Sequence, residues 1–169
     1  MKTLYLLRHG KSDWDAPFDR DFDRPLAKRG RKAADRMGAF FAQTGEPLGC
    51  AVSSPAVRAR RTAERFIEAG VLSIPLTLDE RLYDGDYDEL LDVVRDQSDA
   101  VNALLLAGHQ PTWSDTASLL IGGGDVRFPT AALARINLHI DAWDDIEEDT
   151  GDLIWFVTPR LLKPLMKRR

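Results

Sequence analysis

The chain has 169 residues, of which 44% are hydrophobic and 30% are charged, a balance that excludes disordered, collagen-like and disulfide-scaffold proteins. The formal net charge of −4 argues against general nucleic-acid binding, which usually requires a dominant basic surface. Because Cys50 has no second cysteine to pair with, and neither a signal-like start nor a bilayer-length apolar run is present, we expect a single domain over 1–169 in a cytoplasmic protein that contacts no membrane.

The first half of the chain alternates short strand-forming runs with amphipathic helices. Strands are expected over 3–7 and 49–53, where apolar residues run together and then stop abruptly at polar ones. Helices are expected over about 27–44 and 56–69, where apolar residues recur at helical spacing. Pro55 suits the start of the second helix. A unit of strand, turn and helix therefore occurs twice.

The second half repeats this unit and then changes character. The elements expected there are strands over 76–78, 103–107, 132–140 and 153–157, and helices over 87–96 and from about residue 111 through 121. An acidic turn around 144–151 joins the last two strands. The pattern predicts an α/β fold, a three-layer α/β/α sandwich with a mostly parallel central sheet and a late antiparallel hairpin.

Three of the expected strands end in unusual polar residues. Arg8 and His9 follow the first strand, Arg58 lies one helical turn beyond the second, and His109 follows the strand at 103–107. Ligands of parallel α/β folds bind beyond the carboxyl ends of the strands, so these side chains should converge on one crevice. Either histidine alone could be structural, but two beside glycines, with arginines at matching places, favour a common site.

Arginine at these positions suits phosphate, because its planar guanidinium binds phosphate oxygens through two parallel hydrogen bonds. Structural ion pairing is the alternative role. Four arginines lie on the second helix, namely Arg58, Arg60, Arg61 and Arg65. Arg58 is the candidate, since the first turn lies nearest the strand ends and the positive helix terminus.

The set predicts phosphoryl transfer without a metal or another cofactor. Neutral His9 attacks phosphorus, Arg8, Arg58 and His109 stabilise the phosphoryl oxygens, and water later releases phosphate. His9 must be held neutral by a hydrogen bond, for which a backbone carbonyl near Gly10 is a candidate, whereas His109 helps most as an imidazolium kept charged by substrate. A zinc site is the weaker alternative, because metal-binding spacings are missing and the arginines repel cations.

These segments resemble a known family. Leu-Leu-Arg-His-Gly at 6–10, Ser-Ser-Pro-Ala-Val-Arg-Ala at 53–59 with Thr-Ala-Glu at 62–64, and Gly-His at 108–109 are similar, in the same order, to the histidine phosphatase superfamily, which includes cofactor-dependent phosphoglycerate mutases and many phosphatases. When the segments Lys-Ser-Asp-Trp at 11–14 and Asp-Arg-Pro-Leu at 23–26 are included, the chain looks like the short SixA-type branch of phosphohistidine phosphatases. The resemblance implies removal of a phosphoryl group from a histidine of a partner protein, through a phosphohistidine on His9, in a phosphate pocket made by Arg8, Gly10, Arg58 and His109.

A proton donor is less evident from the sequence. Phosphate esters have poor leaving groups, and Glu80 is similar in setting to the glutamate that mutase-like relatives carry for protonation. The alternative is an exposed carboxylate paired with Arg81, and Asp84 and Asp86 are nearby rivals. Phosphohistidine expels its imidazole easily and needs no strong acid, so a working Glu80 would favour ester substrates.

Three activities therefore remain as alternatives to a phosphohistidine phosphatase: hydrolysis of small phosphate esters, mutase chemistry, and phosphate binding without turnover. The aromatic residues Trp14, Phe18 and Phe22 are expected to pack a loop onto the body rather than to cap the site. The basic residues near the end of the sequence are expected to form a solvated tail: Lys163, Lys167, Arg168 and Arg169.

Overall fold

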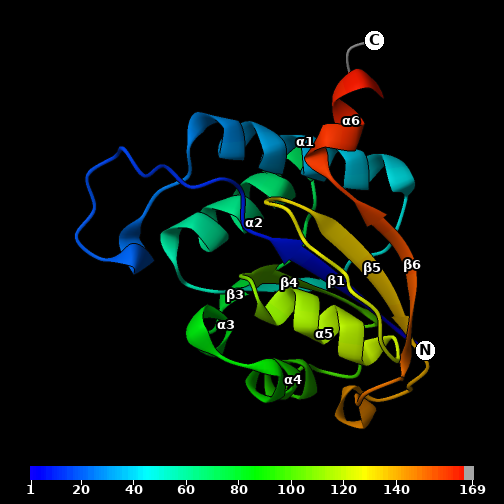
Figure 1. The fold of residues 1–169 in the computed structure, drawn as a ribbon. Coiled ribbons are helices and arrows are strands. Elements are labelled where there is room, and N and C mark those ends of the chain that lie inside the picture. The colour runs from blue at the N-terminus through cyan, green and yellow to red at the C-terminus, as the bar shows by residue number, and fades with distance from the viewer. Residues whose placement is uncertain (166–169) are drawn as a thin grey trace.

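The computed structural model describes residues 1–165 and contains one six-stranded sheet with helices on both faces (Figure 1). The strands are β1 (Lys2–Arg8), β2 (Cys50–Ser53), β3 (Leu76–Leu78), β4 (Ala103–Gly108), β5 (Leu133–Leu138) and β6 (Gly151–Val157). The helices are α1 (Lys28–Thr44), α2 (Val57–Gly70), α3 (Arg81–Asp84), α4 (Tyr87–Arg95), α5 (Thr112–Leu120) and α6 (Pro159–Leu165), with 3₁₀ turns η1 (Asp21–Asp23) and η2 (Trp143–Asp145).

The strand order in the sheet is β3-β2-β4-β1-β5-β6. The four strands β1, β2, β3 and β4 are parallel to one another, through the pairs β1/β4, β2/β4 and β2/β3. β5 runs antiparallel to both β1 and β6. The predicted three-layer fold with a mostly parallel sheet and a late antiparallel hairpin is therefore confirmed. The hairpin extends the parallel sheet on the side of β1, away from β2 and β3.

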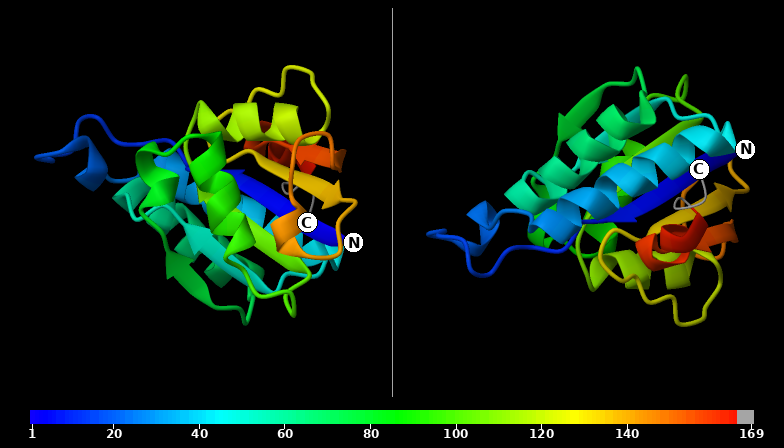
Figure 2. Two further views of the ribbon diagram at one scale, coloured as in Figure 1. Left: turned by 90° about the horizontal axis from the view of Figure 1, so that it is seen from below. Right: turned by 90° about the horizontal axis from the view of Figure 1, so that it is seen from above.

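Side chains of the buried strands alternate between two cores, as the two-residue period of a strand requires. Leu4 and Leu6 of β1 belong to the core beneath α4 and α5, whereas Tyr5 and Leu7 belong to the core beneath α1 and α2. Figure 2 shows these helix pairs on opposite faces of the sheet. Because both faces are covered, the central strands have continuous apolar runs with fully buried side chains.

The structure adds elements that the sequence pattern did not predict. The connection between β5 and β6 is more than an acidic turn, because its η2 turn buries Trp143, whose indole Nε1–H donates to the Val101 carbonyl at 2.9 Å. Lys163 is exposed, as expected for a solvated residue, but it lies on α6 rather than in a tail. Lys167, Arg168 and Arg169 lie outside the described residues.

Within residues 1–165, no helix is both long and apolar enough to cross a bilayer.

Candidate active site

The ends of three parallel strands lie level with one another and form the site. Arg8 at the end of β1 pairs in register with Gly108 of β4, and Ser53 of β2 pairs with Ala107. The residues that follow therefore meet at one edge of the sheet, and the rings of His9 and His109 lie 5.1 Å apart between centroids. The structure thus brings together the side chains that the sequence placed in one crevice.

His9 is buried and held in one orientation. Its Nδ1 lies 2.7 Å from the carbonyl oxygen of Gly10, and because a carbonyl only accepts, Nδ1 carries the proton. Burial lowers the pKa of His9 to about 4, the bond to Gly10 opposes this shift, and the positive charges of Arg58 and Arg8 add to it. At neutral pH, Nε2 is therefore unprotonated and its lone pair is available for attack.

The loop that carries His9 is anchored on both sides. The Gly10 N–H donates to the Thr62 hydroxyl at 2.9 Å, and that hydroxyl donates to the Arg58 carbonyl at 2.6 Å. On the other side, Gly30 in the first turn of α1 packs so closely that a Cβ there would lie 2.2 Å from the Lys11 carbonyl oxygen. Thr62 and Gly30 therefore fix the loop that carries His9 to α2 and α1.

His109 faces His9 and is also neutral in the free site. Burial lowers its pKa to about 2, with further lowering by His9 and the nearby arginines. Its Nε2 lies 2.8 Å from the hydroxyl of Ser54, while its Nδ1 is buried and has no partner among residues 1–165. An imidazolium at His109 therefore requires the negative charge of a bound phosphate.

Arg58 stands apart from the other arginines of α2. Arg60, Arg61 and Arg65 pair with carboxylates on the helix surface or on α1. Arg58 is buried instead, and its guanidinium binds the carboxylate of Asp21 at 2.8 Å and the carbonyl of the same residue at 2.7 Å. These bonds orient the guanidinium and leave its Nε–H free.

Arg24 is a candidate site residue to which the sequence pattern assigned no role. It does pair with Asp21 at 2.8 Å, yet it is only 8% exposed, and its charge lowers the pKa of both histidines. Partial burial raises the pKa of Asp21, but Arg58 and Arg24 together hold that pKa below its usual range. Arg24 and Arg58 bind the same carboxylate of Asp21, and the sequence alone does not reveal this shared contact.

The site contains buried hydrogen-bonding nitrogens that the protein does not satisfy. Among residues 1–165, Arg8 Nε, Arg58 Nε and His109 Nδ1 have no protein partner. Buried polar atoms without partners are costly, and the two arginine N–H groups gain acceptors if an anion binds beside His9, as does His109 Nδ1 when that ring is protonated. Within the same residues no three His, Cys, Asp or Glu side chains are placed together to hold a metal ion. The donor set fits an oxyanion such as phosphate.

Glu80 lies beside this centre rather than inside it. It is exposed and lines a cavity of about 550 Å³ whose wall includes Phe22, Pro55 and Tyr83. The tyrosine ring packs edge-on against His109, with 5.6 Å between centroids, so this cavity borders the histidine pair.

The neighbours of Glu80 have other partners. Glu80 is exposed, as the alternative to a proton donor required, but its pairing with Arg81 is not formed, because Arg81 binds Asp79 and Asp96, each at 2.7 Å. Of the two rival carboxylates, Asp86 caps the start of α4. Asp84 lines the same cavity as Glu80.

The aromatic residues of the 13–27 loop do more than pack. Phe22 stacks edge-on against Tyr83 at 5.1 Å between centroids and so helps to wall the site. The ring of Trp14 lies 3.7 Å from the guanidinium of Arg24 and is 62% exposed. The expectation that these rings only hold the loop against the body is therefore incomplete.

Comparison with known proteins places the chain in a family. Residues 4–117 match the model of the histidine phosphatase superfamily (branch 1). An uncharacterized protein of Mycobacterium leprae (strain TN) is 31% identical over 166 residues, which cover 91% of this chain and all of that protein. A crystal structure of an Agrobacterium tumefaciens protein, provisionally assigned as the phosphohistidine phosphatase SixA, is 29% identical, with a TM-score of 0.78 over 94% of this chain and 98% of that one. The protein histidine phosphatase SixA in complex with tungstate shares the fold, at 22% identity, with a TM-score of 0.81 over 95% and 99% of the two chains.

Proposed function

The chain belongs to the histidine phosphatase superfamily, and from that premise we propose that it removes phosphoryl groups from phosphohistidine in a partner protein, through a phosphohistidine on its own His9. Membership supports phosphatase activity in general. The observation that carries the proposal is the pairing of a neutral, oriented His9 with buried nitrogens that lack protein partners.

The reaction has two steps. Nε2 of His9 attacks phosphorus, the bond between phosphorus and the substrate imidazole breaks, and that imidazole leaves with the bonding pair and takes up a proton. Water then attacks the phosphorus on His9, and Nε2 is released together with inorganic phosphate. The Gly10 carbonyl keeps the proton on Nδ1, so that the charge of the imidazolium-like intermediate is stabilised by this bond.

The cations of the site stabilise the phosphoryl group while it is transferred. Arg8, Arg58 and Arg24 donate to its oxygens, and binding of this charge raises the pKa of His109 so that it also donates. Because Arg24 and Arg58 are buried and already oriented by Asp21, little reorganisation is needed when charge develops. We propose that this chemistry proceeds without a metal ion, so a chelator should leave turnover unchanged.

The position of Glu80 bears on the substrate. It is exposed, and it makes no side-chain hydrogen bond within residues 1–165. A phosphohistidine substrate has a good leaving group and needs no strong acid, which supports this substrate over esters. A second candidate, hydrolysis of small esters, is favoured by the single fact that Glu80 lines the cavity beside Tyr83 and His109.

One comparison tests the proposal: phosphate release from a phosphohistidine peptide and from an aryl phosphate by wild type, His9→Ala and Glu80→Gln. We expect wild type to prefer the peptide, His9→Ala to lose both activities, and Glu80→Gln to keep the peptide activity. Equal release by His9→Ala would refute His9 as nucleophile. Binding of phosphate without release by wild type would indicate a silent binding module, and transfer between two positions of one substrate would indicate a mutase.

A further inference from the structure

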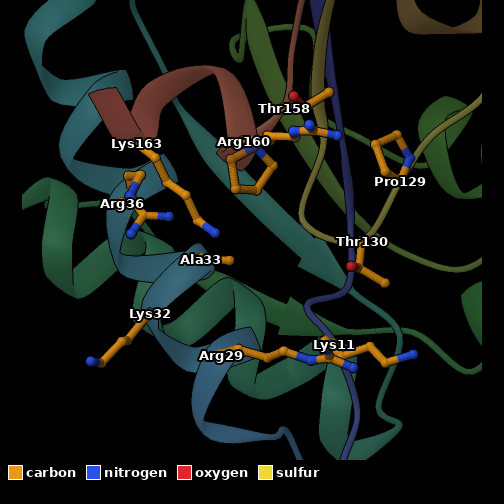
Figure 3. A pocket seen from close by; sticks show the side chains of 11 residues that line it. Lys11, Arg29, Lys32, Ala33, Arg36, Pro129, Thr130, Thr158, Arg160 and Lys163 are labelled. Atoms are coloured by element: carbon orange, nitrogen blue, oxygen red, sulfur yellow. The ribbon is translucent and has the colours of Figure 1, made fainter. Parts of the chain in front are cut away.

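A second pocket, of about 660 Å³, lies between α1, α6 and the loop that precedes β5 (Figure 3). Most of its wall consists of long cationic side chains, and in Figure 3 these come from the nucleophile loop, from α1 and from α6. The basic pocket, as we call it, is defined by Lys11, Arg29, Lys32, Arg36, Arg160 and Lys163. No carboxylate is among its described lining residues.

In the described part of the chain, these six cations lack the carboxylate partners that most other arginines have. Ten other arginines in the described part of the chain form ion pairs with carboxylates. Within residues 1–165, none of the basic-pocket residues is in an ion pair. In a chain of net charge −4, this concentration of uncompensated positive charge creates a local field that attracts anions.

The rest of the wall indicates which anion fits. The neutral residues among the described lining are Ala33, Pro129, Thr130, Thr158 and Pro159, and none of the described lining residues has an aromatic ring on which a nucleotide base could stack. Lys11 and Arg36 are half-buried and the other four cations are exposed. Flexible, exposed cations on three elements suit several carboxylates along a polypeptide better than one tightly held small anion.

The basic pocket adjoins the phosphate site. Lys11 is two residues from His9, and the 128–131 loop that lines the basic pocket also contacts the nucleophile loop directly. In that loop, the Ala131 N–H donates to the His9 carbonyl at 3.0 Å, and the Phe128 carbonyl accepts from Arg8. A polypeptide that enters the phosphate site can therefore extend into the basic pocket.

We propose that the basic pocket binds an acidic segment of the phosphorylated protein substrate and so selects that protein. This inference rests on the proposed function for its substrate, but the binding itself does not depend on turnover. Because surface charges mainly set encounter rate and partner choice, the pocket affects protein substrates and not small ones.

The test uses two phosphohistidine peptides of equal length, one with glutamates beside the phosphohistidine and one with glutamines. The variant Lys32→Glu is compared with Lys28→Glu, which makes the same charge change one helical turn away on α1, at an exposed position outside the pocket. We expect wild type to prefer the glutamate peptide in kcat/KM, and Lys32→Glu to reduce that preference about fivefold. Lys28→Glu should retain it, high salt should weaken it, and all three proteins should hydrolyse an aryl phosphate equally.

A binding measurement separates this inference from the proposed function. Fluorescence anisotropy with the unphosphorylated, labelled glutamate peptide should show binding by wild type and Lys28→Glu and weaker binding by Lys32→Glu, even if no phosphohistidine were hydrolysed. Equal binding of glutamate and glutamine peptides would overturn the inference while leaving the phosphatase intact. Displacement of the peptide by tripolyphosphate at far lower concentration than by polyglutamate would also overturn it, in favour of a phosphate-rich small molecule.

Discussion

Substituting Thr62 by valine isolates the link between the nucleophile loop and α2. The hydroxyl of this fully buried side chain accepts from the Gly10 N–H and donates to the Arg58 carbonyl. Valine has nearly the same shape as threonine but lacks the hydroxyl. Leaving a buried N–H without its acceptor costs about 1–3 kcal/mol. For a chain of 169 residues, about 3 °C of Tm corresponds to 1 kcal/mol, so we expect Tm to fall by about 3–9 °C.

Activity should fall by more than this stability loss explains. A loop that shifts by about 1 Å misplaces Nε2 of His9 and costs up to about 100-fold in rate. The assays are thermal melting followed by circular dichroism, and steady-state hydrolysis of an aryl phosphate well below the melting temperature. Thr62→Ser, which retains the hydroxyl, should preserve most of the activity.

Thr116 of α5 provides a matched control. It is also fully buried, but its hydroxyl has no partner in the described part of the chain. Thr116→Val should therefore leave Tm unchanged or raise it slightly, with full activity. If Thr62→Val behaved like Thr116→Val in both assays, the role of Thr62 in holding the His9 loop would be refuted.

Three further predictions concern the site. Gly30→Ala places a Cβ 2.2 Å from the Lys11 carbonyl and should displace the nucleophile loop, lowering Tm and costing about 1–3 kcal/mol of stability; an unchanged melt would contradict the close packing. Arg24→Lys loses the planar guanidinium and should lower kcat/KM roughly 10–100-fold, as measured with the phosphohistidine peptide; wild-type kinetics would exclude Arg24 from the phosphate site. The folded-state pKa values of His9 and His109, about 4 and about 2, lie below the ordinary value of 6.5, so the unfolded chain binds more protons below pH 6.5. The full contribution of the two neutral histidines to stability should therefore be present above pH 6.5 and be lost as the pH falls through 4 toward 2. The loss should be less steep in His109→Gln, and parallel curves of Tm against pH for the two proteins would contradict neutral burial of His109.

The fold could be predicted because its signals are local. The apolar runs that became β1 and β4 and the periodic segments that became α1 and α2 depend on residues near in sequence, and their observed bounds differ from the predicted ones by one residue or so. By contrast, α3 is a single turn at Arg81–Asp84 and was missed, since four residues carry no recognisable period. Burial of Trp143 in η2 depends on a distant contact with Val101, which no local pattern predicts.

The same distinction separates the predicted from the missed parts of the site. Arg8, His9 and His109 were found because each follows an apolar strand directly. Arg24 and Thr62 were not assigned roles, because their importance arises from contacts across the chain, with Asp21 beside Arg58 and with Gly10. The pairing of Arg81 with Asp79 and Asp96, which leaves Glu80 without that partner, likewise depends on how α4 packs beside α3.

The central claim is that His9 itself carries the phosphoryl group during turnover. The most direct measurement is a rapid quench of wild type with a phosphohistidine peptide in alkali, which preserves phosphohistidine, followed by mass spectrometry of the digested protein. The account predicts one phosphoryl group on the peptide that contains His9, absent from His9→Ala, which should also show no turnover. Turnover by His9→Ala at the wild-type rate, with no phosphorylated His9 in wild type at any quench time, would contradict it.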